Sequence, residues 1–507
     1  MKRLARLLAS LVVLAAMTAW AAAQTVVIAQ GTDAVTLDPH DVTDSPTATV
    51  VSHMYETLFE LQPNGDIVPH LATGYEVSAD GTVWTIDLRD DVMFHNGVPM
   101  TAEIVKGSFD RFLDPDNAFT FRFLLDRITD VAVTGEHQIQ FTLSTPFAPL
   151  LAHLTHNTTA VVLPSYVAEQ GEAFGEEAIG TGPFEFGSWD RGTRIDLETN
   201  DFYWGDVPQI DGVAFLAVPE NTTRMALVES GEAHVAVRVP PQDIARLNAA
   251  DGITVENVSS LRTIYMYFNH TLEPFTDVRV RQAFNHAVNN EEIAEFVLGG
   301  AVRPSDAAIA PGIFGYTPVG GYEYDPERAR ELLAEAGFPD GLETTLYSPT
   351  GRYLQDIQIT EAIQSQLAEV GIDATIETLE WSAYLDLTRQ PAGENEVPVA
   401  LLGWGTVTGD ADYGLYALFH TSQHVPDGSN RAFYSNPEVD ALLDEARVNT
   451  NPDEREALYA EALEIINADA PWLFLHSETQ LVAVNDAVNG LVIHPTERVL
   501  AWNVTVD

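Results

Sequence analysis

The sequence predicts a mixed α/β fold whose domains are intertwined rather than arranged in a row. Strand-like runs alternate with amphipathic helices along most of the chain, as in GVAFLAV followed by NTTRMALVESGE. No long linker, internal repeat or low-complexity segment interrupts this order. The 507 residues, 46% of them hydrophobic, also suffice for two or three domains with substantial cores.

The amino-terminal part begins with a strand. TVVIAQ, residues 25–30, has the composition of a buried strand, and Gly31 follows it. The apolar spacing over residues 48–61 predicts a helix. Thr101 stands before a second apolar stripe and predicts a capped helix over residues 101–113. Further strands are predicted over residues 82–94, 137–145, 194–200 and 212–218.

The carboxy-terminal part alternates helices and strands. Asp325 followed by Pro326 predicts a helix start, and Gly337 predicts its end. A buried strand that ends at Trp404 precedes a helix containing DYGLYALF. Helical segments are also predicted over residues 221–232 and 277–298, a strand over 234–239, a helix and then a strand over 357–379, and the series closes with 436–446 and 451–475.

The charge balance excludes one class of partner. Asp and Glu number 75 against 25 Lys and Arg, which gives a formal net charge of -50. Because this field repels polyanions, we expect no nucleic-acid binding. The acidity is typical of a protein that stays soluble in high salt, and equally of a low-pI product of a GC-rich genome. Cysteine is absent, so no disulfide contributes to stability.

Residues 1–23 have the pattern of a cleaved secretory signal peptide. MKRLAR is a short basic region, an uncharged apolar run follows, and Ala21 and Ala23 precede Gln24 as a small-x-small cleavage site. An uncleaved membrane anchor is the alternative, although 17 apolar residues are at the lower limit for spanning. We expect the mature chain to begin at Gln24 without a lipid anchor, in the periplasm. Removal of Lys2, Arg3 and Arg6 takes the charge from -50 to -53.

Five segments, taken in order, resemble one protein family. They are TLDPHDVTDSPTATVVSHMYETLFEL, LATGYEVSADGTVWTIDLRDDVMFHNGVPMTAEIVKGSFDR, IGTGPFEFGSWDRGTRIDLETNDFYWG, FNHTLEPFTDVRVRQAFNHAVN and YDPERARELLAEAGFPDG. The family is that of the extracellular solute-binding proteins of peptide and nickel ABC transporters, family 5. FYSNPEVDALLDEA and TGDADYGLYALF are most similar to its glutathione-binding members.

The resemblance implies a periplasmic binding protein-like type II fold, with two lobes built from three domains that close around a ligand cleft. Domain I would comprise residues 24–66, 178–270 and 483–507; domain II, residues 67–177, would be inserted in it; domain III would be residues 271–482. The implied protein is a monomer without cofactor that captures glutathione or a di- or oligopeptide and delivers it to an ABC permease in the inner membrane. A nickel or metal-chelate receptor of the same family is the alternative.

The resemblance also points to a ligand wall between residues 401 and 419. Dipeptide-binding members carry an aspartate three residues after the tryptophan to hold the ligand ammonium, but Val407 stands there in this chain. The next acids are Asp410 and Asp412, so one of them is expected to face the ammonium, Asp410 first. The alternative is that either acid caps the following helix. Trp404 and Tyr413 are expected at the ligand or, alternatively, in the core.

Arg352 is the expected cation of the site. It matches the position where the dipeptide-binding members present an arginine to the ligand carboxylate, and a guanidinium binds a carboxylate through two parallel hydrogen bonds. A surface ion pair with Asp356 is the alternative. Weaker candidates, equally consistent with plain turn residues, are Ser45, Thr47, Asn157 and Thr158.

Two other function classes find little support in the sequence. An enzyme would need a recognisable constellation, but there is no Gly-x-Ser-x-Gly elbow, His-Glu-x-x-His motif, phosphate-binding glycine loop or cysteine nucleophile. Asp410 and Asp412 lie too close in sequence to establish a glycosidase pair. The histidine pairs in HLTH and HTSQH lack a third clustered ligand, so no metal site is predicted.

Overall fold

The computed structural model describes residues 24–507. The expected signal peptide, residues 1–23, lies outside the described residues. None of the helices within residues 24–507 is long and apolar enough to cross a membrane.

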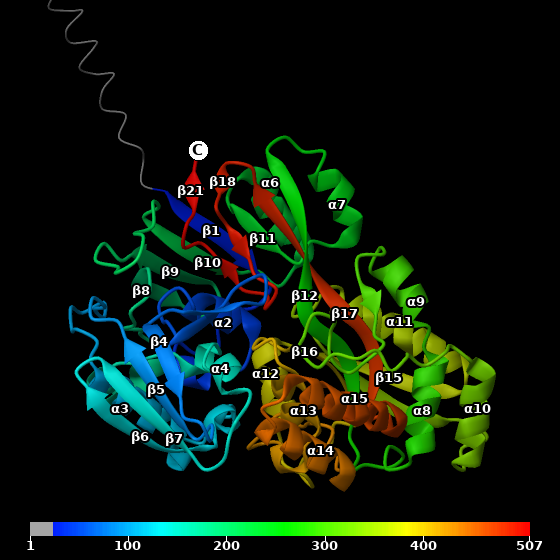
Figure 1. Ribbon diagram of the computed structural model, residues 1–507. Helices are drawn as coiled ribbons and strands as arrows, with labels where there is room; N and C mark the ends of the chain where they lie inside the picture. Colours follow the sequence, from blue (N-terminus) through cyan, green and yellow to red (C-terminus); the bar gives the residue numbers. More distant parts are fainter. Residues whose placement is uncertain (1–23) are drawn as a thin grey trace, which may run out of the picture.

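One sheet of eleven strands runs through the molecule, in the order β15-β14-β16-β12-β17-β11-β1-β10-β9-β8, with β13 against β17. β12 and β17 are its longest strands, and Figure 1 shows them crossing side by side from one half of the molecule to the other. The bounds are β1 Thr25–Gln30, β8 Phe184–Asp190, β9 Arg194–Thr199, β10 Gly212–Ala217, β11 Val235–Val237, β12 Ile253–Phe268, β13 Arg303–Pro304, β14 Leu342–Pro349, β15 Ile372–Leu379, β16 Val399–Gly405 and β17 Trp472–Asn485.

The pairing of β12 with β17 divides this sheet into two parts. Residues 253–259 of β12 pair with the end of β17, which also pairs with β11, whereas residues 262–268 pair with β16. The register shifts between Ser259 and Thr263. We therefore name residues 24–259 and 479–507 the first lobe and residues 263–477 the second lobe. A register shift bends and twists a strand pair locally, which suits the crossing point between two lobes.

A separate antiparallel sheet of four strands, β4-β5-β7-β6, is inserted in the first lobe. We name residues 72–154 the inserted unit. Its elements are β4 Ala72–Val77, β5 Val83–Leu88, α3 Ala102–Leu113, β6 Ile128–Gly135, β7 Gln138–Leu143 and α4 Leu150–His153, with single turns of 3-10 helix at Pro115–Asn117 and Arg122–Leu125. In Figure 1 this unit lies beside α13 and α14 of the second lobe.

Helices cover the remaining faces. The first lobe carries α2 Ser45–Val51, α5 Pro164–Gln170, α6 Asn221–Ser230 and α7 Pro241–Leu247, and the small strands β2 Phe59–Leu61, β3 Ile67–Pro69, β18 Val488–Asn489, β19 Val492–Ile493, β20 Val499–Leu500 and β21 Thr505–Val506. The second lobe carries α8 Val278–Ala287, α9 Asn290–Glu292, α10 Pro326–Glu335, α11 Asp356–Glu369, α12 Trp381–Thr388, α13 Ala411–Phe419, α14 Pro437–Val448 and α15 Pro452–Asp469.

Most elements lie where the sequence predicts them. Thr101 caps α3 by accepting the amide hydrogen of Ile104, and Asp325 caps α10 by accepting that of Arg328. The helix predicted over residues 48–61 is wrong in its second half, because α2 ends at Val51 and residues 59–61 form β2. Val50, Val51 and Met54 pack in one hydrophobic core, whereas Leu58 and Phe59 pack in another. Their combined spacing nevertheless matches that of one continuous helix.

The mixed α/β architecture with a lobe on either side of two crossing strands agrees with the expected fold class. The domain limits predicted from the sequence stay a prediction. Within the described residues, the register shift at Ser259–Thr263 falls inside the segment predicted as domain I.

Candidate ligand-binding site

A cavity lies where the two lobes and the inserted unit meet. The first lobe contributes the start of α2, the inserted unit contributes Phe121, and the second lobe contributes β16, α12 and the loop before α11. Because residues from all three parts line it, the cavity is complete only when the parts are in contact.

Arg352 is buried at this cavity, with 2% of its surface exposed. Its Nε and Nη1 atoms have no hydrogen-bond partner among residues 24–507. The guanidinium carbon lies 4.6 Å from the centre of the Tyr353 ring and 5.1 Å from that of Trp381. Burial away from water lowers the pKa of Arg352. A buried donor without an acceptor is costly, so the site favours a ligand that brings an anionic oxygen.

The loop that presents Arg352 is fixed by its backbone. The Asp356 carboxylate accepts the amide hydrogens of Arg352 (2.8 Å) and Tyr353 (3.2 Å), so Asp356 anchors the loop and is not a surface ion partner of the guanidinium. Gly351 has φ +73°, and a Cβ atom on Gly31 would stand 2.1 Å from the Gly351 carbonyl oxygen. The end of β1 and the Arg352 loop therefore meet backbone to backbone across the two lobes.

An aromatic wall closes one side of the cavity. The ring centres of Trp404 and Tyr413 are 4.9 Å apart, and those of Phe121 and His156 lie 5.6 and 4.9 Å from Tyr413. Trp404 is at the end of β16 and Tyr413 is in the first turn of α13, as the sequence predicts. The Trp404 Nε1 hydrogen has no acceptor within the described chain. Both residues therefore belong to the cavity lining as well as to the core.

Of the four weaker candidates, two line the cavity and two do not. Ser45 and Asn157 line it, and the Asn157 side-chain nitrogen lacks a partner in the described part of the chain. Thr47 is fully buried and its hydroxyl is shared between Asp44 and the Val35 amide. Thr158 is also fully buried and its hydroxyl contacts His156. The structure thus gives Thr47 and Thr158 local partners in place of a ligand.

Arg262, on β12, connects the cavity with both lobes. Its Nη2 donates to the Ser45 hydroxyl of the first lobe (2.6 Å) and its Nη1 donates to the Gly403 carbonyl of the second (2.6 Å). Its Nε lies 2.7 Å from a Glu497 oxygen and 3.6 Å from a Glu478 oxygen. Burial and then the Glu497 charge raise the pKa of Glu478 to about 8. Burial also acts to raise the pKa of Glu497, but Arg262, Arg352 and Arg238 together outweigh it and lower that pKa to about 2. One guanidinium therefore faces a carboxylate pair that holds one proton at neutral pH.

Cationic groups outnumber anionic groups in the lining. The arginines are Arg262, Arg352, Arg431 and Arg498, whereas Asp44 is the one carboxylate among the described lining residues. Asp44 caps α2 by accepting the Thr47 amide and hydroxyl hydrogens. Burial raises the pKa of Asp44. Its position makes it the candidate acceptor for a ligand ammonium.

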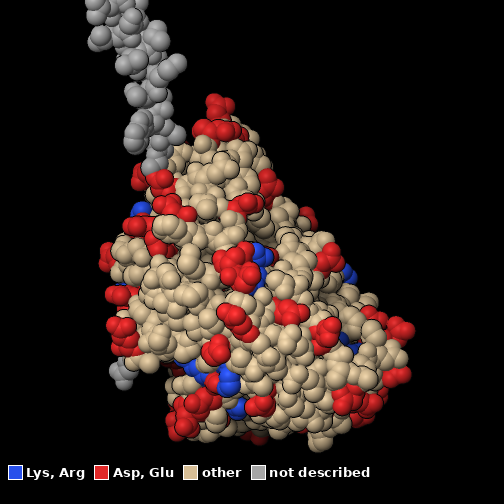
Figure 2. Space-filling view, turned by 60° about the vertical axis from the view of Figure 1, so that its left-hand side comes forward, with Lys and Arg blue, Asp and Glu red and all other residues tan. Residues whose placement is uncertain are grey.

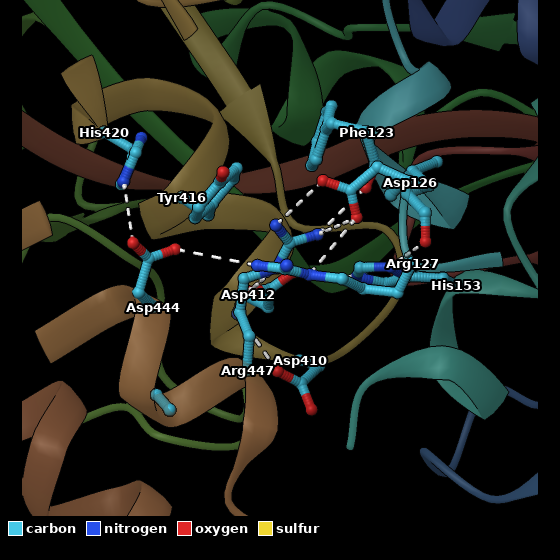
Figure 3. A network of polar contacts seen from close by, with 12 residues as sticks. Phe123, Asp126, Arg127, His153, Asp410, Asp412, Tyr416, His420, Asp444 and Arg447 are labelled. Carbon is cyan, nitrogen blue, oxygen red and sulfur yellow. Dashed lines mark hydrogen bonds and ion pairs between the residues drawn. The ribbon is translucent and has the colours of Figure 1, made fainter. Parts of the chain in front are cut away.

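Asp410 and Asp412 have partners within the protein (Figure 3) and do not line this cavity. Asp410 caps α13, and its two oxygens accept from Arg455 Nη2 at 2.9 and 3.0 Å. Asp412 lies 3.3 Å from Arg447 Nε and 3.2 Å from His153 Nε2. The helix-capping alternative thus describes Asp410. After Trp404 the chain turns so that both carboxylates lie buried beside these partners and away from the cavity, which the spacing alone does not reveal.

The two histidine pairs do not converge on one point. His153 contacts Asp412, whereas His156 contacts Thr158. His424 contacts the Tyr434 carbonyl, while His420 contacts Ser422. Among the described residues there is no group of three or more His, Cys, Asp or Glu side chains that could hold a metal ion.

Several residues that line the cavity are not predicted as ligand contacts from the sequence. Asp44 stands in Asp-Ser-Pro-Thr, which is a typical helix N-cap with proline in the first turn. This capping pattern is the sequence signal that could have identified Asp44. The scarcity of basic residues, 25 in 507, applies to Arg262, Arg431 and Arg498 as it does to Arg352. Tyr353 and Trp381 give no such indication, because aromatic residues are more often core than ligand contacts.

Comparisons with known proteins identify the family. The profile described as "Bacterial extracellular solute-binding proteins, family 5 Middle" matches residues 66–425. The glutathione-binding protein GsiB of Pectobacterium atrosepticum is 32% identical over 476 residues, which cover 94% of this chain and 92% of that protein. GsiB of Salmonella typhi is 33% identical over 94% of this chain and 93% of its own length.

A solved structure with the same fold is that of the ABC transporter-associated periplasmic binding protein DppA from Helicobacter pylori, in complex with the peptide STSA. It superposes with a TM-score of 0.89 at 29% identity, covering 95% of this chain and 98% of that one. The profile match over most of the chain and the agreement along its whole described length lead to one conclusion. The chain belongs to the bacterial extracellular solute-binding proteins of family 5.

Proposed function

We propose that the protein captures a small peptide-like solute with at least one free carboxylate in the periplasm and delivers it to the permease of an ABC importer. The observation that carries this proposal is Arg352, a buried arginine with two donor atoms lacking partners in the described chain, at a cavity shared by two lobes. The similarity to GsiB and to a peptide-bound DppA supports the ligand class.

The balance of charges narrows the ligand further. Four arginines and one carboxylate line the cavity within the described residues, so a solute with more carboxylates than ammonium groups is the best match. Glutathione carries two carboxylates and one ammonium, and is therefore the first solute to test. In this arrangement Arg352 holds a carboxylate, Asp44 holds the ammonium, and Trp404 and Tyr413 contact the apolar surface of the ligand.

Titration calorimetry on the purified mature protein tests the proposal. Reduced glutathione, a neutral dipeptide and nickel with histidine would be titrated separately into protein that has been unfolded and refolded to remove bound solute. We expect glutathione to bind with micromolar or tighter affinity and the dipeptide to bind more weakly. Binding of nickel–histidine alone would replace the proposed function with that of a metal-chelate receptor. Binding of none of the three would reject glutathione.

The proposed location follows from the predicted signal peptide, and the other proposed properties follow from the family. The mature chain would begin at Gln24, act as a monomer without cofactor, and have no catalytic activity of its own. Amino-terminal sequencing of the soluble periplasmic fraction checks the location, because an anchored precursor would retain Met1 in the membrane fraction.

A further inference from the structure

Arg447, on α14 of the second lobe, is the centre of a buried contact with the inserted unit (Figure 3). Its Nη2 donates to the Phe123 carbonyl at 2.9 Å and lies 3.1 Å from Asp126 Oδ1. Its backbone carbonyl accepts the amide hydrogen of Ala148 at 3.0 Å. The guanidinium carbon also lies 4.8 Å from the Phe147 ring centre. Four residues of the inserted unit therefore contact one arginine of the other lobe.

A second contact crosses the same boundary beside it. Asp412, on α13, lies 3.3 Å from Arg447 Nε within the second lobe and 3.2 Å from His153 Nε2 of the inserted unit. We name Arg447, Asp412, Asp126 and His153 the clasp. The side chains of Arg447 and His153 are fully buried and that of Asp412 is 1% exposed, whereas that of Asp126 is 29% exposed. Burial acts to raise the pKa of Asp412, but Arg447, His153 and Arg455 together outweigh it and hold this pKa below its usual value, so the carboxylate is charged at neutral pH.

The charges of the clasp lie within ion-pair distance of one another only while the lobes are together, and Asp412 is held there by these ion pairs with Arg447 Nε and His153 Nε2, without a hydrogen bond to either. If α14 moves away from the inserted unit, Arg447 loses the Phe123 carbonyl and Asp126, and Asp412 loses His153. Buried charges are costly unless they are paired. A partly closed arrangement would remove water from Arg447 and Asp412 without supplying these partners, and it is therefore disfavoured. The clasp therefore favours two arrangements, a hydrated open one and a fully closed one. None of its four residues lines the ligand cavity.

We propose that Arg447 is a positioning residue for ligand capture, which fixes the closed geometry of the lobes through Asp126 and His153 without touching the ligand. The inference rests on the proposed function for its effect on affinity, although closure can be measured independently. A ligand stabilises the closed arrangement only by its preference for it. Weakening the clasp lowers the fraction of the protein in the closed arrangement. The apparent affinity for the ligand falls by the same factor as this closed fraction.

The test uses Asp126→Asn and Arg447→Lys, with Asp130→Asn as the matched control. Asp130 is an exposed residue of the same inserted unit, on β6, and the same substitution there removes a charge outside the clasp. Because the sequence lacks cysteine, Glu76→Cys on β4 and Glu361→Cys on α11 introduce two unique, exposed labelling sites, one on each side of the boundary. Pulsed EPR distances between spin labels then report the closed fraction, with and without reduced glutathione.

We expect the empty wild-type protein to populate the clasped arrangement measurably, and glutathione to complete it. Both clasp variants should lower the closed fraction and raise the Kd for glutathione at least fivefold, and the double variant should be no weaker than Arg447→Lys alone, because the two changes remove one shared contact. Asp130→Asn should match the wild type in both measurements.

The possible failures are distinguishable. If the clasp variants lower the melting temperature but leave the closed fraction and the Kd unchanged, Arg447 is merely structural and the inference is overturned. If glutathione does not bind the wild type, the proposed ligand fails. The clasp is then judged on the empty protein, where an unchanged distance distribution in both variants overturns it and a shift to longer distances upholds it.

Discussion

Arg352 shows how one side chain assigns the chemistry of a site. Its guanidinium is buried, contacts two aromatic rings, and has Nε and Nη1 without acceptors in the described part of the protein. Burial lowers its pKa, so the protein bears a cost for keeping a cation there. A ligand carboxylate removes that cost by supplying two charge-assisted hydrogen bonds.

Arg352→Ala should weaken ligand binding by about 2–5 kcal/mol, because the ligand carboxylate is left buried without a partner. The melting temperature of the empty protein should change little, since Nε and Nη1 of Arg352 donate no hydrogen bond to any other group in the described structure. Arg352→Lys should recover only part of the loss, because an ammonium does not reproduce the planar fork. Calorimetry and thermal melts measure both effects. An Arg352→Ala protein that binds as tightly as the wild type would show that the cavity is not the ligand site.

At the scale of elements, the segment from β16 to α13 contains two residues with different roles close together in sequence. Trp404, next to the last residue of β16, lines the cavity, whereas Asp410, the N-cap of α13, does not line it and instead stabilises the helix packing. Asp410 both caps the helix and pairs with Arg455 of α15, so it joins α13 to the outer helices.

Asp410→Ala should lower the free energy of unfolding by about 3–5 kcal/mol, because Arg455 would remain buried without its carboxylate. Affinity for the ligand should be unchanged in the folded fraction, since the side chain does not line the cavity. Chemical denaturation and calorimetry separate the two quantities. If Asp410→Ala abolished ligand binding but left the free energy of unfolding unchanged, Asp410 would be a ligand contact after all.

A titratable pair of carboxylates lies beside Arg262 of β12: Glu478 is on β17, and Glu497 is in the segment between β19 and β20. Burial and the Glu497 charge raise the pKa of Glu478 from 4.5 to about 8, so the folded state binds a proton that the unfolded chain releases. Its contribution to stability is complete below pH 4.5 and is lost as the pH rises through 8. Glu497 has the opposite sign: its pKa is lowered to about 2, and its contribution is lost as the pH falls below 4.5.

Glu478→Gln should therefore flatten the pH dependence of stability. Between pH 5 and 8 the wild type should lose stability with a limiting slope of about 1.4 kcal/mol per pH unit from this group. The glutamine variant lacks the titrating proton and should lose less over the same interval. Urea denaturation at the two pH values measures the difference. Parallel losses in the two proteins would mean that Glu478 is ionised throughout.

At the scale of the whole molecule, the dominant property is negative charge. Figure 2 shows acidic side chains scattered over the visible face, with basic side chains few and mostly beside them. The formal charge of -50, which becomes -53 with the predicted loss of Lys2, Arg3 and Arg6, produces self-repulsion that salt screens. An anionic ligand is nevertheless compatible with this surface, because exposed charges beyond about 8 Å are screened at physiological ionic strength and the local arginines decide.

The melting temperature should rise between dilute buffer and roughly molar sodium chloride, as screening reduces repulsion in the folded state. Scanning calorimetry over a series of salt concentrations measures this, and a parallel series in sucrose controls for general solute effects. A flat or falling curve would show that the acidity does not limit stability.

The sequence by itself determines most of the elements and the family, although residues 59–61 form β2 and not the predicted helix. Caps such as Thr101 and Asp325, and the periodicity of β16 and α13, depend on local interactions that are written in neighbouring residues. The ordered set of family segments determines the two-lobed fold. Arg352 and Trp404 line the cavity, and the resemblance to the family predicts both as ligand contacts.

Only the tertiary structure decides which carboxylates face the ligand. The directions of Asp410 and Asp412 depend on Arg455 and Arg447, which lie 45 and 35 residues later in the chain. Asp44 and Arg262 come to one cavity from elements more than 200 residues apart. A side chain with two possible roles takes the one that its distant partners satisfy, because a buried charge must be paired. That pairing is a property of packed elements, and no local pattern encodes it.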